Sequence, residues 1–173
     1  MTVQISPTTI VDLPDLMALW NDGAVMGFVG FPDGLGATPE SMDGWFRRLG
    51  RNRRTELTEH FTIRNDGTYC GEAYYWIDTN HGHLGTLDIK LTSTARGKGI
   101  GAAGLSRAIE EAFAHGALRV YVDPNPANDK AIALYTRLGF QGATPPPHIA
   151  TSWSGMDFHP VYMELAPEQQ LGA

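Results

Sequence analysis

Cysteine, long apolar runs and an export signal are scarce or missing in this 173-residue chain. The single cysteine, Cys70, rules out a disulfide within the chain, and its place in an apolar strand pattern indicates a core residue. No apolar run approaches the ~18 residues that a membrane-spanning helix needs. The first residues lack both a basic and an apolar region, so we expect no signal peptide and no membrane partner. These absences predict a cytoplasmic protein.

Positive charge is also limited, because 13 Lys and Arg stand against 19 Asp and Glu and give a formal net charge of −6. A nucleic-acid partner would require a basic face, so we expect none, whereas a cationic amine substrate is compatible with this balance. At this length, residues 1–173 are expected to form a single domain, as a monomer or a homodimer. The sequence predicts no metal, because four histidines show no metal-ligand spacing: His81, His83, His148 and His159.

The most informative stretch is residues 87–116, which reads as a strand, a loop rich in glycine and cations, and an amphipathic helix. Leu87, Ile89 and Leu91 alternate with polar residues, which is the period of a half-buried strand. Apolar residues then recur at helical spacing, and Gly116 is suited to ending that helix. The loop glycines let the backbone approach a ligand, and the first helical turn leaves N–H groups unpaired and partly positive. An anion, most often a phosphate, fits such a site.

Several ligands could use a loop of this kind. Residues 99–104 match GxGxxG, and Asp123 closes the next apolar strand, as in a dinucleotide-binding fold. In that fold the first glycine follows its strand directly, whereas here residues 92–98 intervene and too little chain follows for six strands. A nucleotide P-loop fails because no GK[ST] follows at the required spacing. From the loop alone, a plain surface loop with two solvated cations remains an alternative.

A second motif, along a later helix, decides between these alternatives. The two motifs are Arg96-x-x-Gly99-x-Gly101 and Asn128-x-x-Ala131-x-x-x-Tyr135-x-x-x-Gly139-Phe140. With both motifs in this order, the chain resembles the GNAT superfamily of N-acetyltransferases, most closely over residues 60–140. The segments 123–128 and 161–163 look most like those of the aminoglycoside 6′-N-acetyltransferases.

The resemblance implies an α/β (α+β) fold whose mixed, mostly antiparallel sheet is splayed between strands 4 and 5 and flanked by helices. The residue patterns independently give the compatible order β-α-α-β-β-β-α-β-α-β-β. They include a hairpin of residues 60–64 and 68–78 around the turn Asn65-Asp66-Gly67, and a helix that begins at Thr38-Pro39. Residues 161–165 are expected to form the last strand.

Acetyl-CoA is the co-substrate that the resemblance implies, bound where the sheet is splayed. Its pyrophosphate would bind the N–H groups of residues 97–102, with added charge from Arg96 and Lys98. Strand residues would pair with the pantetheine arm through their backbone, and Asn128 would hydrogen-bond that arm, although a plain helix N-cap explains Asn128 equally well. The expected cofactor-binding residues are Ile89, Leu91, Arg96, Gly97, Lys98, Gly99, Ile100, Gly101, Ala102 and Asn128.

The implied reaction is attack of a neutral amine on a thioester, with departure of a thiolate. Tyr135 matches the family's tyrosine that protonates the thiolate, although its place in an apolar stripe also fits a core residue. Primary amines are mostly protonated at neutral pH, so a carboxylate is expected to accept that proton. Three carboxylates near the splay are candidates, in the order Asp123, Asp88 and Glu72, against the alternative that each is simply solvated.

A small cationic amine, such as an aminoglycoside or a polyamine, is the expected acceptor, because acidic residues line the pocket of the enzymes that the chain resembles. A protein N-terminal or lysine amine is the alternative, and a non-catalytic acyl-CoA-binding sensor is the alternative of another class. Direct transfer is expected because Cys70 lies in the hairpin, away from the thioester. Residues 21–37 and 145–160 would form the acceptor side, with Trp20, Phe28, Phe31, Trp153 and Phe158 as candidate walls.

Overall fold

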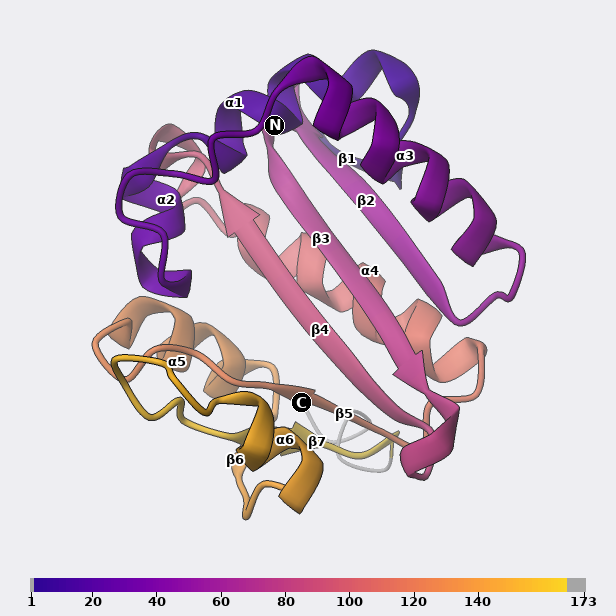
Figure 1. The fold of residues 1–173 in the computed structure, drawn as a ribbon, viewed down its shortest axis with the longest axis vertical. Coiled ribbons are helices and arrows are strands. Elements are labelled where there is room, and N and C mark those ends of the chain that lie inside the picture. Colours follow the sequence, from indigo (N-terminus) through magenta and orange to yellow (C-terminus); the bar gives the residue numbers. More distant parts are fainter. Residues whose placement is uncertain (1, 168–173) are drawn as a thin grey trace.

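One seven-stranded sheet forms the centre of the computed structural model, which describes residues 2–167. The strand order is β1-β2-β3-β4-β5-β7-β6, and only the pair β4–β5 is parallel. Figure 1 shows the long strands β2, β3 and β4 side by side, with β5 and β7 lying near the start of β4 and turning away from its remaining length. The strands are β1 (Val3–Pro7), β2 (Thr58–Asn65), β3 (Thr68–Asp78), β4 (Leu84–Leu91), β5 (Arg119–Val122), β6 (Gln141–Gly142) and β7 (Met163–Leu165).

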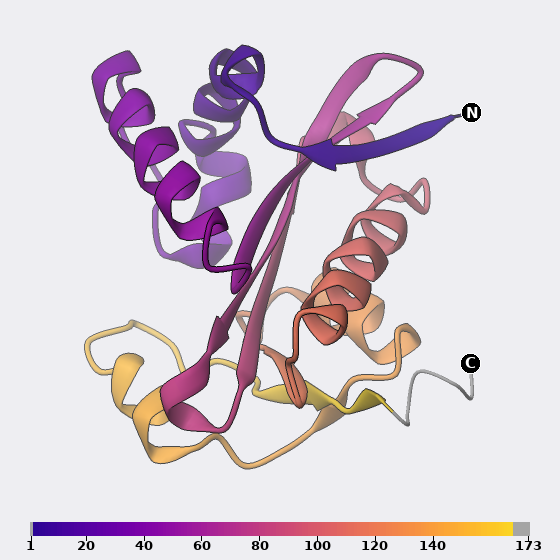
Figure 2. The ribbon, with the colours of Figure 1, turned by 90° about the vertical axis from the view of Figure 1, so that its right-hand side faces the viewer.

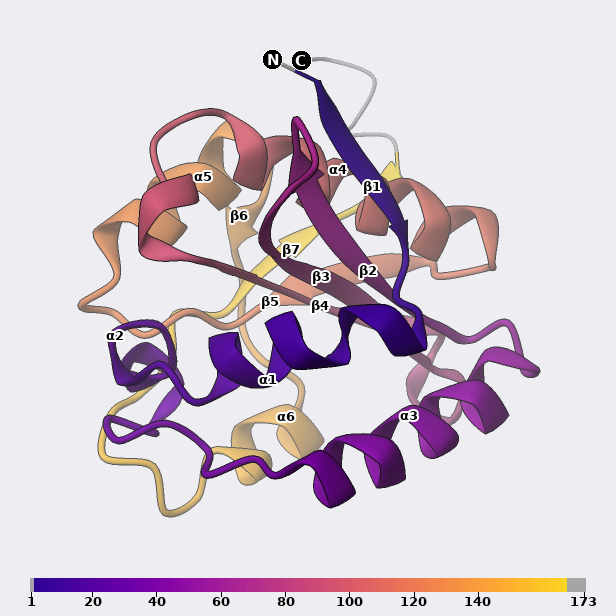
Figure 3. The same cartoon turned by 90° about the horizontal axis from the view of Figure 1, so that it is seen from above.

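Helices cover both faces of this sheet. Helix α4 packs against β2, β3 and β4 on one face, whereas α1 and α3 lie together on the other face (Figures 2 and 3). This arrangement confirms the predicted α/β class with a mostly antiparallel sheet flanked by helices. The α-helices are α1 (Leu13–Trp20), α2 (Gly23–Met26), α3 (Pro39–Arg53), α4 (Ile100–Ala114), α5 (Asp129–Arg137) and α6 (Pro147–Ser152).

The local signals in the sequence act as predicted at several turns and helix ends. Asp66 and Gly67 have φ values of 48° and 81°, and this left-handed turn joins β2 to β3. The Thr38 side chain accepts a hydrogen bond from the Ser41 N–H and caps α3. Gly116, at φ 94°, follows the end of α4. The hairpin, the start of α3 and the end of α4 are therefore confirmed.

The splay between β4 and β5 is the feature that creates a site. The two strands pair over only three positions, from Leu84 opposite Arg119 to Thr86 opposite Tyr121. By contrast, β4 pairs with β3 along the whole length of β4, from Leu84 to Leu91. Within residues 2–167, the edge of β4 beyond Thr86 therefore has no strand partner on the β5 side, as the resemblance predicted.

The main core lies between the sheet and α4. The predicted apolar stripe of α4 is buried there, with Leu105, Ala108, Ile109 and Ala112 each at most 2% exposed. Gly104 faces the sheet so closely that a Cβ would lie 2.3 Å from Cδ1 of Ile63. The last glycine of the GxGxxG pattern thus serves close packing of the helix against the sheet.

Some boundaries differ from the predicted ones. Strand β4 begins at Leu84 rather than at residue 87, because Gly85 interrupts the apolar alternation yet packs against Val120 of the parallel partner. The loop predicted over residues 21–37 contains α2, and the segment 145–160 contains α6, which begins at Pro147. Strand β7 starts at Met163, two residues later than predicted, because the Val161 N–H bonds to the Pro124 carbonyl. Among the described residues, no helix combines the length and apolarity that a bilayer crossing needs.

Candidate active site

The glycine-rich loop joins β4 to α4 beside the open edge of β4. Gly97 and Gly99 have φ values of 76° and 77°, and Gly99 is the N-cap of α4. A Cβ at either position would meet nothing within 4 Å, so the left-handed backbone is what requires glycine here. Ile100 anchors the first helical turn in the core at 1% exposure. The N–H groups of this turn are thereby fixed in place to receive an anion.

The two cations of the loop differ in their surroundings. The Arg96 guanidinium donates to the Leu91 carbonyl through Nε and Nη2, each at 3.3 Å, and Nη2 also donates to the Ala24 carbonyl at 3.4 Å. Arg96 thus ties the loop to the end of β4 and to α2. Lys98 is exposed beside the glycines. Both positive charges lie in the glycine-rich loop where an anion is expected, and Arg96 also has a structural role.

Ile89 and Leu91 lie on the part of β4 that pairs with β3 but, within residues 2–167, has no strand partner on the β5 side, where the sequence predicted the pantetheine contacts. The Ile89 N–H donates to Oδ1 of Asp88 at 2.7 Å, and the Leu91 carbonyl accepts from Arg96. A ligand that paired with these two backbone groups as a neighbouring strand would replace their hydrogen bonds to the side chains of Asp88 and Arg96. Their side chains face α4, since Ile89 and Leu91 both contact the position of Gly101.

Asn128 is the N-cap of α5. Its Oδ1 accepts a hydrogen bond from the Ala131 N–H at 3.2 Å, so the capping role that the sequence offered is confirmed. The amide nitrogen of the same side chain still carries two donors. Asn128 therefore combines a capping role with spare donors for a ligand.

Tyr135 lies on α5 with 5% exposure, and its ring packs against Phe140 at 5.8 Å between centroids. Burial raises the pKa of the Tyr135 phenol, and the charge of Asp88 raises it further. The phenol therefore keeps its proton at neutral pH and can act as a donor. The residue is both a core tyrosine and a protonated acid, so the two interpretations of the sequence are compatible.

Asp123 directly follows β5 at the mouth of the splay. Burial raises the pKa of Asp123 to about 6, with a contribution from the charge of Asp88, while a hydrogen bond from Trp153 opposes the rise. The donor is the indole Nε1, 2.9 Å from Oδ2. A carboxylate with such a pKa is ionised at neutral pH and is a stronger base than an ordinary aspartate.

The other two candidate bases are engaged with Lys90. Asp88 pairs with the Lys90 ammonium and accepts the Ile89 N–H. Glu72 is 1% exposed and accepts from Lys90 at 3.2 Å, from His60 at 2.7 Å and from Trp20 at 3.0 Å. Although burial opposes the change, the charges of Lys90 and His60 lower the pKa of Glu72 to about 2. Glu72 is thus a poor proton acceptor and a structural anchor for this side of the sheet.

A pocket of about 430 Å³ lies on the face of the sheet that α1 and α3 cover. Of the aromatic residues predicted as walls, Trp20 lines this pocket, whereas Phe28 and Phe31 are exposed and do not line it. Trp153 lies beside Asp123 instead. Sequence reasoning missed several lining residues, although alternation along the strands placed some of them on one face: Trp45, Arg48, His60, Tyr74, Trp76 and Lys90.

The structure thus has the sheet, splayed beside a glycine-rich loop, that the resemblance to acyl-CoA-dependent acetyltransferases implied. The sequence pattern described as "Acetyltransferase (GNAT) family" matches residues 34–140. The chain therefore belongs to the GNAT family and is an N-acetyltransferase, as the two motifs predicted. No curated protein sequence is similar enough to match this chain.

Solved structures of several acetyltransferases share the fold at low sequence identity. Phosphinothricin acetyltransferase of Sinorhizobium meliloti, in complex with acetyl-CoA, has a TM-score of 0.75 at 22% identity, covering 96% of this chain and 89% of its own. Spermidine N-acetyltransferase of Vibrio cholerae, in complex with CoA and spermine, has a TM-score of 0.75 at 16% identity, covering 98% of each chain. Aminoglycoside acetyltransferase AAC(6')-Ib, with coenzyme A and kanamycin, has a TM-score of 0.71 at 20% identity, covering 97% and 96%.

Proposed function

We propose that residues 1–173 act as one cytoplasmic acetyltransferase domain that moves an acetyl group from acetyl-CoA to a small primary amine by direct transfer. The observation that carries this proposal is the position of Asp123, whose pKa of about 6 suits a base, at the mouth of the splay. Tyr135, which retains its proton, lies near the same charges. A base and an acid are thus available beside one open strand edge.

The residues around the splay fit acetyl-CoA. The left-handed glycines of residues 97–99 and the first turn of α4 suit the pyrophosphate, with Arg96 and Lys98 as countercharges. The backbone of Ile89 and Leu91 and the free amide of Asn128 suit the pantetheine arm. When bound, acetyl-CoA supplies the acetyl group as a thioester.

Proton movements then belong to the chain's own residues. Asp123 accepts a proton from the acceptor ammonium, directly or through water, and so makes the amine a nucleophile. Tyr135 donates its phenolic proton to the departing sulfur. Asp88 and Glu72 are both ion-paired with Lys90, so neither carboxylate acts as the base.

The charges on the pocket walls favour an acceptor that carries an anionic group beside its amine. Glu72 is covered and matched by Lys90, His60 and Trp20, so it offers little free negative charge. The exposed Arg48 also lines the pocket, whereas the Lys90 ammonium is already paired with Asp88 and Glu72. This balance differs from the acidic pocket expected for a polycation such as spermidine or kanamycin.

Thiol release from acetyl-CoA tests the function across a panel of spermidine, kanamycin, phosphinothricin, amino acids and short peptides. We expect the highest kcat/KM with small amines that carry a carboxylate or a phosphinate. Highest turnover with spermidine or kanamycin would instead support a polycationic acceptor. Highest turnover with peptides would support an amine of a protein as the acceptor. Acetyl-CoA binding without turnover on any amine would contradict the proposed enzyme activity and favour a non-catalytic acyl-CoA-binding sensor.

A further inference from the structure

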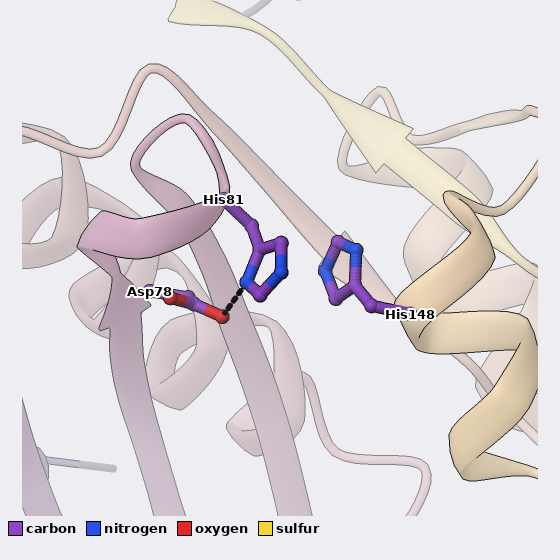
Figure 4. Close-up of side chains that lie close together, drawn as sticks. All are labelled: Asp78, His81 and His148. Carbon is purple, nitrogen blue, oxygen red and sulfur yellow. Dashed lines mark hydrogen bonds and ion pairs between the residues drawn. The ribbon is translucent and has the colours of Figure 1, made fainter.

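Three potential metal ligands meet at the end of the sheet where β3 turns into β4. Asp78 is the last residue of β3, His81 lies in the short 3-10 helix Thr79–His81, and His148 lies in α6. Figure 4 shows His81 between the other two, with its ring facing that of His148. The chain thus brings together a carboxylate and two imidazoles from two distant segments.

The geometry of these three side chains is close to that of a chelate. Their potential ligand atoms all lie within 4.8 Å of one another. Nδ1 of His81 is 2.7 Å from Oδ2 of Asp78, and the rings of His81 and His148 stack with centroids 3.8 Å apart. The His81 side chain is 47% exposed, so an ion can reach it from solvent.

Nε2 of His148 is buried, and no hydrogen-bond partner for it occurs among the residues that the structure describes. Leaving a buried polar atom unpaired is unfavourable, and such atoms in native proteins commonly mark an ion or a water. An ion shared with His81 and Asp78 would satisfy this nitrogen.

We propose that Asp78, His81 and His148 bind a divalent transition metal ion of the zinc class. Two imidazole nitrogens and a carboxylate oxygen suit zinc, cobalt or nickel better than calcium or magnesium, which favour all-oxygen sites. Tetrahedral zinc holds its ligand atoms about 3.3 Å apart, so the stacked rings must turn toward one point and close by roughly 1.5 Å. Three protein ligands leave the fourth position to water.

The sequence predicted no metal, because its histidines lack ligand spacing. Spacing detects ligands that share one helix or one turn, whereas His148 reaches His81 only through the packing of α6 against the β3–β4 turn. The three ligands span residues 78–148, which no short motif covers.

A metal here would also act on the active site, and this consequence rests on the proposed function. Helix α6 carries His148 near its start and ends next to Trp153, whose indole donates to Asp123. An ion that fixes α6 to the β3–β4 turn therefore also fixes the position of the Trp153 indole. Through its hydrogen bond, the indole in turn positions the Asp123 carboxylate. Trp153 is in this sense a positioning residue.

Isothermal titration of the tag-free, chelator-treated chain with Zn²⁺ tests the site. We expect one equivalent to bind, and the affinity to fall more than about 100-fold in His81→Ala and in His148→Gln. His81→Ala alters an exposed turn, and so tests the site even where His148→Gln unfolds the chain. His159→Ala is the matched control, because this histidine is exposed and outside the cluster. Circular dichroism checks the fold of each variant.

Two outcomes would overturn the proposal. One is the lack of any zinc binding by the folded wild-type chain. The other is that one equivalent of zinc still binds to His81→Ala and His148→Gln, or no longer binds to His159→Ala. Either pattern would place the ion elsewhere. Because the titration measures zinc alone, its failure is distinguishable from a failure of the proposed acetyl transfer.

Discussion

The indole Nε1 of Trp153 donates a hydrogen bond to Oδ2 of Asp123 across 2.9 Å, and this contact links the C-terminal end of α6 to the carboxylate at the splay. The bond stabilises the ionised form of a carboxylate that burial otherwise disfavours. Trp153 thereby sets how much of Asp123 is ionised at a given pH.

Trp153→Phe keeps an aromatic ring but removes the donor. The pKa of Asp123 should then rise above its present value of about 6. A hydrogen bond to a charged group is worth about 1.5–3 kcal/mol, so the acidic limb of the kcat/KM profile should shift upward by about one pH unit or more. The pH dependence of kcat/KM measures this shift. An unchanged acidic limb would mean that Asp123 is not the group that titrates in the reaction.

Asp123→Asn should make the protein slower and more stable at neutral pH. Loss of a general base should reduce kcat by about 100-fold to 10,000-fold, while acetyl-CoA binding persists.

The stability effect follows from proton linkage. The folded pKa of Asp123 is about 6 and lies above the ordinary aspartate value, so the folded state holds its proton more tightly than the unfolded state. The free energy of unfolding therefore falls as the pH rises from about 4 to about 6, by at most about 3 kcal/mol. The asparagine variant should lose this dependence. Urea unfolding at pH 4 and pH 7.5 compares the two proteins, and a variant less stable than wild type at pH 7.5 would contradict the argument.

The elements with local signals were predictable from the sequence. The Thr38 cap, the Asn65-Asp66-Gly67 turn and the stripe of α4 each depend on neighbours within one turn of chain. The conformation of the glycine-rich loop was predictable for the same reason, because left-handed glycines and a helix start act locally.

The partners of Glu72 were not predictable in this way. Counting back from the hairpin turn pairs Asn65 with Thr68 and Arg64 with Tyr69, but the next pair is Ile63 with Gly71. The extra residue is a bulge, and it moves every later side chain of β3 to the opposite face. Glu72 therefore faces His60 and Trp20 rather than solvent, which removes it as a base.

Tyr135→Phe should reduce turnover by about 100-fold or more, because the ring still fills its place in the core but no phenol protonates the departing sulfur. Acetyl-CoA affinity should change little. Stopped-flow thiol release and equilibrium binding separate the two effects.

Tyr75→Phe is the matched control for this experiment. Tyr75 is also a buried tyrosine, but its hydroxyl bonds to the Glu56 carbonyl and to His115, away from the splay. Removal of the Tyr75 hydroxyl should leave kcat unchanged. Equal rates in Tyr135→Phe and Tyr75→Phe would reduce Tyr135 to a packing residue.

Arg48→Glu should change which acceptors the enzyme prefers. Arg48 is exposed and lines the acceptor pocket, so a reversed charge should raise KM for an anionic acceptor about fivefold and lower it for a polyamine. Arg47→Glu is the control, because Arg47 is also exposed, does not line the pocket and bonds to the Asp43 carbonyl on its own helix. Both variants change the net charge alike, so a shift confined to Arg48→Glu reports the pocket. Equal shifts in the two variants would assign the effect to long-range charge, and would remove the argument for an anionic acceptor.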